Sequence, residues 1–415
     1  MPSALLSPPP VLRETYHGLL MENVMPFWLR HGIDEIHGGV FTCLRDDGSR
    51  ISEDKYLWSQ GRAVWTFAAV HNRIAPDDRL LAIAQRTADF ILRHGRDEEG
   101  AVLFRVTREG TPLEPATSAY ADYFVAYGLG ELYRATGEER LLEEALAIFR
   151  RAARVTRDPE FDRFAPYARP PGIRRMHGPA MLGLEVAQEL ADITPEPDVQ
   201  DFSAWCLNRI MNHHLSAGNP WLLEHLGPDD RFCDTPEGRA IVPGHVIESL
   251  WFVLHQACRR QDPFLARRAL DAIHFHLEAG WDPEFGGIFL GVDCHGGTPW
   301  WPNAEKKLWW PHTEAIYALL LAHKLTDASW TLEWLDRIQR WAFEKFPDRE
   351  HGEWRQRLDR SGWPISTLVA LPVKDPFHLP RTLVLAINLL DEKSPLPVAQ
   401  LAATLAARSP LEKAQ

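Results

Sequence analysis

Pro243-Gly244-His245-Val246-Ile247-Glu248-Ser249-Leu250-Trp251 opens a segment that is apolar on almost every side. At helical spacing its polar residues form one narrow stripe, and a helix with so little polar surface is buried. His245 and Glu248 lie on that stripe and therefore face the interior, where an unpaired polar group costs about 1–3 kcal/mol. The pair is either a core histidine satisfied by its own glutamate or part of a functional site.

Helical periodicity dominates the rest of the chain, and the helices come in pairs. The predicted helices are Leu12–Arg30, Ser59–Arg73, Asp78–His94, Ser118–Thr136, Glu138–Arg154, His177–Asp192, Asp198–Leu215, Gly244–Arg260, Pro263–Ala279, Pro311–Thr326, Ser329–Phe346 and Phe377–Leu390.

Short glycine-containing segments recur between these pairs and form an internal repeat. Asp34-x-x-x-Gly38-Gly39, Asp97-x-x-Gly100, Asp282-x-x-x-Gly286-Gly287 and Asp348-x-x-x-Gly352 each precede a short apolar run and a second turn, a pattern typical of a β-hairpin. A dozen helices with hairpins at intervals predicts a closed ring of helix pairs. We expect an all-α fold, an (α/α)6 barrel with short β-hairpins at one end. An open α-solenoid is the alternative, but the repeats are too irregular in length for it.

Size and composition favour one globular domain. No low-complexity linker divides the 415 residues, so we expect a flexible N-terminus over residues 1–14, one barrel domain over 15–392 and a C-terminal tail over 393–415. The net charge of −12, without a basic aromatic stripe, argues against nucleic-acid binding. Five scattered cysteines, no signal-peptide pattern and no long apolar run predict a cytoplasmic protein that does not enter a membrane.

Polar residues concentrate at the predicted helix starts, while apolar residues fill the helix interiors. Besides His245, such starts are Ser59-Gln60-Gly61-Arg62, Trp309-Trp310-Pro311-His312-Thr313-Glu314, Phe377-His378-Leu379-Pro380-Arg381 and His177. A barrel would bring these starts together at one end. Aromatic faces beside hydrogen-bonding groups are what a sugar needs.

The available groups restrict the chemistry. The chain has no nucleophile elbow, no phosphate loop and no His-Glu-x-x-His pattern. His312 and Glu314 are two residues apart, which puts them on different sides of a helix, so we expect no metal and no cofactor. Two histidines with a carboxylate and arginines instead suit proton abstraction next to a carbonyl, because imidazole titrates near neutral pH and arginine stabilises an enediolate oxygen.

Six separated motifs resemble the N-acylglucosamine 2-epimerase family, whose relatives include cellobiose 2-epimerases, mannose 2-epimerases and aldose–ketose isomerases. In chain order these motifs are Gly38-Gly39-Val40-Phe41, Lys55-Tyr56-Leu57-Trp58-Ser59-Gln60-Gly61-Arg62, Pro243-Gly244-His245-x-x-Glu248, Gly280-Trp281-Asp282-Pro283, Lys307-Leu308-Trp309-Trp310-Pro311-His312-Thr313-Glu314-Ala315 and Phe377-His378-x-Pro380-Arg381. The resemblance runs from about residue 15 to 390 and implies an (α/α)6 barrel.

The resemblance also implies roles. His245 and His378 would be acid/base groups on opposite faces of carbon 2 of a sugar, Glu248 would orient or charge His245, and Arg62 would hold the enediolate oxygens. The residues implied or expected to line the substrate are His177, Glu314, Trp310, Tyr120, Arg381, His312 and Trp309.

The sequence departs from its relatives at two places. Epimerases of N-acylated sugars tend to have a Gly-Gly and Lys-Gly run before Phe-His-x-Pro-Arg, whereas residues 368–376 read Leu-Val-Ala-Leu-Pro-Val-Lys-Asp-Pro. Ile173 stands where the isomerase and cellobiose branches carry Asn.

We therefore expect a homodimeric sugar 2-epimerase acting on an N-acylglucosamine or glucose type of aldose. The main alternative is an aldose–ketose isomerase that uses the same site. A glycoside hydrolase with Glu248 and Glu314 as its carboxylates, and a non-catalytic sugar-binding protein, are the other two.

Overall fold

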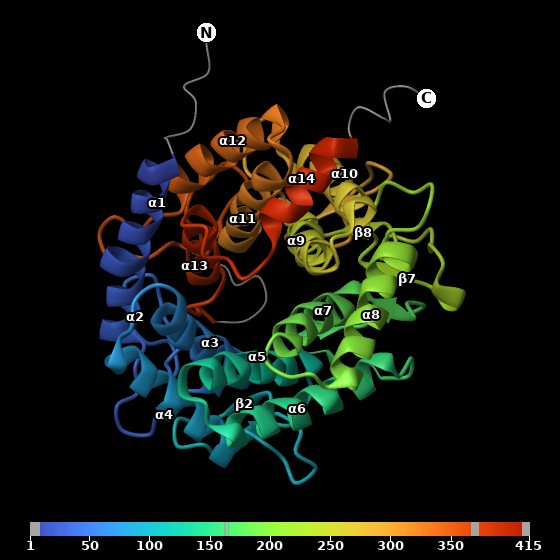
Figure 1. The fold of residues 1–415 in the computed structure, drawn as a ribbon. Coiled ribbons are helices and arrows are strands. Elements are labelled where there is room, and N and C mark those ends of the chain that lie inside the picture. The colour runs from blue at the N-terminus through green and yellow to red at the C-terminus, as the bar shows by residue number, and fades with distance from the viewer. Residues whose placement is uncertain (1–8, 162, 165, 367–372, 409–415) are drawn as a thin grey trace.

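The computed structural model describes residues 9–408 apart from 162, 165 and 367–372, and these residues form a closed double ring of helices (Figure 1). Six helices form the inner ring and are buried on nearly every side: α3 (Leu57–Arg73), α5 (Ala119–Thr136), α7 (His177–Ala191), α9 (Pro243–Arg260), α11 (Trp309–Thr326) and α13 (His378–Leu390). Each contacts the next in this order, and α13 contacts α3, which closes the ring. The predicted (α/α)6 barrel is confirmed.

The outer ring alternates with the inner one along the chain. Its members are α1 (Pro9–Gly18) and α2 (Met25–His31) joined by the π-helical turn η1 (Leu19–Val24), α4 (Asp78–His94), α6 (Glu139–Arg157), α8 (Pro197–Arg209) continued by the π-helical η2 (Ile210–His214), α10 (Pro263–Gly280) and α12 (Ser329–Lys345). These helices are amphipathic, with apolar residues on the side that covers the inner ring. None of the described helices is long and apolar enough to cross a membrane.

All twelve predicted helices are present, with boundaries that differ by a few residues. The two ends of the chain differ more. Helix α1 begins at Pro9, so part of the segment expected to be flexible is helical. The expected C-terminal tail contains α14 (Val398–Arg408), which packs on α9, α10 and α11 with Leu401 and Leu405 buried.

Short antiparallel strand pairs lie at one end of the barrel, as predicted. They are β1 (Lys55–Tyr56), β2 (Arg105–Val106) and β3 (Pro112–Glu114) in one sheet, and the pairs β4 (Arg163–Phe164) with β5 (Tyr167–Ala168), β6 (Arg175–Met176) with β7 (His225–Leu226), β8 (Ala240–Ile241) with β9 (Val292–Asp293), and β10 (Lys307–Leu308) with β11 (Arg357–Leu358). A 3₁₀ turn, η3, covers Pro228–Asp230. The glycine repeats themselves are not hairpin ladders, because each is closed by a single bridge such as Ile33 to Val40.

Buried lysine–carboxylate pairs fasten the glycine turns to the inner helices. Lys55 Nζ donates to Asp34 Oδ2 at 3.0 Å, and Lys307 Nζ donates to Asp282 Oδ2 at 3.1 Å, with no side-chain exposure in either pair. In the first turn Gly38 and Gly39 have φ near +79° and +78°, which favours glycine. Because both lysines immediately precede an inner helix, these pairs fix where α3 and α11 begin.

Candidate active site

Helices α3, α7 and α11 begin directly after a strand, and α9 begins one residue after β8. In the first three, the first N–H of the helix donates to the carbonyl of the residue before the partner strand. For example, the His177 N–H donates to the Glu224 carbonyl at 2.9 Å, which joins the start of α7 to the residue before β7. Proline in the first turn, as at Pro243, breaks no helical hydrogen bond, because an N–H at that position would have no partner within the helix. The inner helices therefore present their first residues at the end of the barrel that carries the strands.

Trp310 lies against both predicted acid/base histidines. Its ring centroid is 5.1 Å from that of His245 and 5.6 Å from that of His378. Gly244 permits this contact, since a Cβ at that position would lie 2.5 Å from Trp310 Cζ3. The structure thus brings together α9, α11 and α13 at the point where the two imidazoles meet one indole.

His245 pairs with the carboxylate of Glu224, a residue that was not predicted to belong to the site. Glu224 Oε2 lies 3.2 Å from His245 Nδ1, and the carboxylate is 6% exposed. Burial opposes a charge on His245, but the adjacent Glu224 carboxylate outweighs it and raises the pKa of His245 above its usual value. The same contact holds the pKa of Glu224 well below its usual range, despite its burial.

The second histidine has a different environment. His378 Nδ1 lies 2.7 Å from Glu314 Oε1, but that oxygen also accepts from Arg381 Nη2 at 2.8 Å. Burial, together with the nearby Arg62 and Arg381 cations, lowers the pKa of His378 to about 3. His378 is therefore neutral near pH 7.

Glu248 does not make the predicted contact. Its Oε1 accepts from Arg381 Nη2, while His245 pairs with Glu224. The expectation that Glu248 orients His245 is wrong, whereas its carboxylate does favour the charged form of His245. The reason is the Arg381 guanidinium, which lies between the helices and pairs with both Glu248 and Glu314.

Arg62 is anchored by Asp375, another residue that was not among the predicted site residues. Arg62 Nη1 donates to Asp375 Oδ2 at 2.9 Å, and Ser59 Oγ donates to the same oxygen at 3.2 Å. The guanidinium lies 4.0 Å from the Phe124 ring centroid, and its Nε is buried without a hydrogen-bond partner. Asp375 thus fixes a cation whose side chain remains 11% exposed.

The predicted catalytic and substrate-lining residues differ in exposure. Those with some exposed side-chain surface are Arg62, Tyr120, His245, Trp309, Trp310 and His378. Glu314 and Arg381 are about 1% exposed. Glu314 bonds His378 and Arg381 bonds Glu314, so both residues position the histidine and have almost no surface for contact with a sugar.

Two predicted substrate-lining histidines are fully buried. His312 Nδ1 donates to the Leu308 carbonyl at 2.7 Å, its Nε2 accepts from the Ile288 N–H at 2.9 Å, and the ring stacks on Trp341. His312 is therefore a structural residue. His177 bonds Ser249 Oγ through Nε2 at 3.0 Å, and its Nδ1 lies 3.8 Å from the Glu224 carboxylate. The His177 ring therefore contacts Glu224 from within the buried interior.

Glu248, Glu314 and His378 are the described residues closest to a metal-ligand arrangement, with one ligand atom from each within 4.8 Å of the others. Arg381 Nη2 already bonds both carboxylates at this place. A cation there would have to displace the guanidinium, so this donor set fits an ion pair better than a metal ion.

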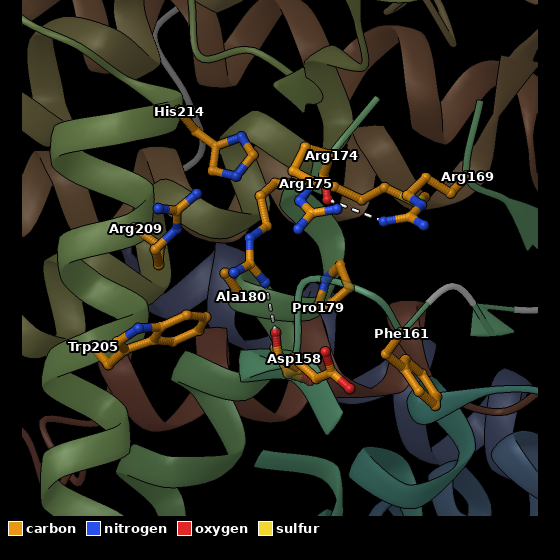
Figure 2. Close-up of a pocket in the computed structure, with 12 residues that line it drawn as sticks. Asp158, Phe161, Arg169, Arg174, Arg175, Pro179, Ala180, Trp205, Arg209 and His214 are labelled. Atoms are coloured by element: carbon orange, nitrogen blue, oxygen red, sulfur yellow. Dashed lines mark hydrogen bonds between the residues drawn. The ribbon is translucent and has the colours of Figure 1, made fainter. Parts of the chain in front are cut away.

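A small cavity lies beside the first turn of α7, where Pro179 and Ala180 line it (Figure 2). Its wall includes His214, whose ring centroid is 5.3 Å from that of His177, and several arginines. Arg209 pairs with Asp230, and Arg175 donates to the Thr156 carbonyl at 3.3 Å. With a volume of about 20 Å³ the cavity holds no more than a water molecule.

The site combines one histidine that favours its proton, one that favours the neutral form, and an arginine that a carboxylate holds in place. Such a set can remove a proton from one face of a carbon, stabilise the resulting oxyanion and return a proton from the other face.

Comparison with known proteins identifies the family. A model of the N-acylglucosamine 2-epimerase family matches residues 39–379. The Bos taurus N-acylglucosamine 2-epimerase is 32% identical over 406 residues, which cover 94% of this chain and 93% of the relative. A D-mannose isomerase from Pseudomonas cannabina pv. alisalensis is 27% identical over 206 residues, covering 44% of this chain and 47% of the isomerase. The structure of cellobiose 2-epimerase from Bacillus thermoamylovorans superposes with a TM-score of 0.79 at 18% identity, covering 91% and 99% of the two chains, and confirms the fold. The protein belongs to the N-acylglucosamine 2-epimerase family.

Proposed function

We propose that this protein, as a carbohydrate 2-epimerase of the isomerase class, interconverts an N-acylglucosamine and the corresponding N-acylmannosamine. The observation that carries the proposed chemistry is the pair of imidazoles, His245 and His378, that flank Trp310 in different electrostatic environments. The choice of sugar is supported by relatives: N-acylglucosamine 2-epimerases match across nearly the whole chain, while the mannose isomerase match covers less than half of it.

The reaction begins on the ring-opened aldose. One imidazole takes the proton from carbon 2, the electrons move onto the carbonyl oxygen, and an enediolate forms. Arg62 is the cation best placed to stabilise that oxygen, because Asp375 fixes its guanidinium, its side chain is 11% exposed, and it lies near His378. The other imidazole then returns a proton to the opposite face of carbon 2. Each acid/base group would contribute about 10²–10⁴-fold to the rate.

Trp310 and Trp309 would supply the apolar face for the sugar. Both indoles are partly exposed, and Trp309 packs edge-on against His378 with 5.9 Å between ring centroids. An aromatic face beside hydrogen-bonding groups suits the carbon-bound hydrogens and hydroxyls of a sugar.

A substrate panel in deuterated water tests the proposal. We would incubate the protein with N-acetylglucosamine, glucose, mannose and cellobiose, and identify products and label by NMR. The expected result is N-acetylmannosamine with deuterium at carbon 2. A ketose as the sole product would instead identify an aldose–ketose isomerase, because that outcome requires proton delivery to carbon 1. Conversion of glucose or cellobiose alone would keep the epimerase chemistry and overturn the choice of sugar.

We also propose that the protein is a cytoplasmic homodimer, on the basis of its family and its scattered cysteines, of which Cys43, Cys206 and Cys258 are buried and unpaired. Sedimentation at micromolar concentration tests the dimer, and a monomer would overturn it. Cell fractionation tests the location, and recovery outside the cytoplasm would overturn it.

A further inference from the structure

We propose that Glu224 is a positioning residue of the reaction: it fixes the Nδ1 side of His245 and makes this ring the proton donor of the resting histidine pair. The inference rests on the proposed function, since it names which member of the pair begins as acid and which as base. For the epimer whose carbon 2 hydrogen faces His378, the donor role goes to His245 and the acceptor role to His378; the other epimer needs the reverse roles.

The first support is the way in which Glu224 is held. Its carbonyl accepts from the His177 N–H at 2.9 Å, and the adjacent strands β6 and β7 pair, so its backbone is tied to the start of α7. Its carboxylate oxygen Oε2 lies 3.2 Å from His245 Nδ1 and 3.8 Å from His177 Nδ1. His177 is itself held by Ser249 through the other ring nitrogen. The carboxylate is therefore confined between two imidazoles.

The second support is the contrast with Glu314, the carboxylate beside His378. Glu314 also accepts from Arg381 and from Trp251 Nε1, the latter at 2.9 Å, so its charge is shared with a buried cation. Among the described residues, no arginine or lysine pairs with Glu224. The Glu224 carboxylate is therefore paired with the imidazoles of His177 and His245 and not with a permanent cation.

The remaining groups around the two rings point the same way. His245 faces Glu224, Glu248 and the Trp310 ring, and the two carboxylates favour its charged form. His378 faces Arg62 and Arg381, which disfavour its charged form. It also faces Glu248 and Asp375, whose opposite effects do not overcome burial and the two cations. A raised pKa for His245 and a lowered one for His378 are consistent with this geometry.

The assignment predicts the shape of the pH profile. At neutral pH the active form carries a proton on His245 and none on His378. As pH rises through the pKa of His245, that proton is lost and activity falls. The alkaline limb of kcat/KM therefore reports His245, and the charge of Glu224 sets its position.

Glu224→Gln tests the inference, because the amide oxygen can still accept from Nδ1 while the charge is gone. We expect the pKa of His245, followed by NMR of ¹⁵N-histidine-labelled protein and assigned with His245→Asn, to fall by roughly one unit or more. We expect the alkaline limb to move to lower pH by a similar amount and kcat to fall more than about tenfold. Glu224→Asp, which keeps the charge, should retain an alkaline limb close to that of the unchanged protein.

Glu185→Gln is the matched control. Glu185 is a buried carboxylate of α7 that bonds Tyr127 and Gln188, away from both catalytic histidines, and its replacement should leave the titration of His245 unchanged. If His245 titrates in Glu224→Gln as it does in the unchanged protein, the inference is overturned. Absence of epimerase activity in the unchanged protein would refute the proposed function instead, and the NMR titration would still decide the role of Glu224.

Discussion

Replacing Arg381 with methionine removes the one guanidinium that separates two buried carboxylates. Arg381 is 1% exposed, and its Nη2 contacts both Glu248 and Glu314, whose side chains are 4% and 1% exposed. Breaking a buried pair in this way leaves an uncompensated charge and costs about 3–5 kcal/mol. Glu314 keeps His378 and Trp251 as donors, whereas Glu248 has no other hydrogen-bond partner among the described residues. We therefore expect Glu248 to become the strained group.

The loss should depend on pH. Without its cation, a charged Glu248 carboxylate is buried and unpaired, so the variant should be least stable where this carboxylate is charged and should recover stability in acid. We expect urea unfolding to show a deficit of about 3–5 kcal/mol at pH 7 and a smaller one at pH 5. The double variant Arg381→Met/Glu248→Gln should recover at least about 1 kcal/mol at pH 7 by removing the unpaired charge. A deficit below about 1 kcal/mol, or one equal at both pH values, would refute this account of the ion pair.

Three further predictions concern stability and geometry. Burial raises the pKa of Glu185 to about 8 from a usual 4.5, so its contribution to stability falls as pH rises between these values. As pH rises through that range, Glu185→Gln should therefore gain stability relative to the unchanged protein by up to about 1.4 kcal/mol per pH unit. A difference in unfolding free energy between the two proteins that is the same at pH 5 and at pH 8 would contradict this. Gly244→Ala should lower kcat/KM roughly 10²-fold, because the added Cβ pushes Trp310 from its place between the histidines; a crystal structure with Trp310 unmoved would count against that reason. His312→Phe should lose about 1–3 kcal/mol of stability through two lost backbone hydrogen bonds while KM stays unchanged, and a raised KM at unchanged stability would return His312 to the substrate site.

Most of the fold could be predicted because the inner and outer helices carry different apolar patterns. The outer helix α4 is amphipathic, while α11 is apolar all round, and both patterns are visible over more than four turns. Helix α14 was missed although Val398, Leu401 and Leu405 follow helical spacing, because the segment is short and its partner helices are not near it in sequence. The glycine repeats indicated turns correctly. The pairing of the strands could not be predicted from local pattern, because β8, for example, pairs with β9 about fifty residues later in the sequence.

The histidines of the site were predictable, but their carboxylate partners were not. Glu248 is three residues from His245 on the same helix, so spacing alone favours that pair. What decides against it is Arg381, which reaches the carboxylate from another helix. Glu224 lies in a loop within the apolar run Leu222-Leu223-Glu224-His225-Leu226, and a single carboxylate among apolar residues was the available signal of a buried, partnered charge.

The most direct test of two bases on opposite faces of carbon 2 is hydrogen exchange by His378→Asn in deuterated water. If His245 and His378 each serve one face, this variant should lose at least about 10²-fold of its net epimerisation. The neutral fraction of His245 should still remove and return the proton on its own face, so one epimer should exchange its carbon 2 hydrogen without becoming the other. His245→Asn should show the same behaviour with the other epimer. If each single variant keeps more than about a tenth of the unchanged epimerisation, or if one histidine is dispensable for exchange with both sugars, the two-histidine account is contradicted.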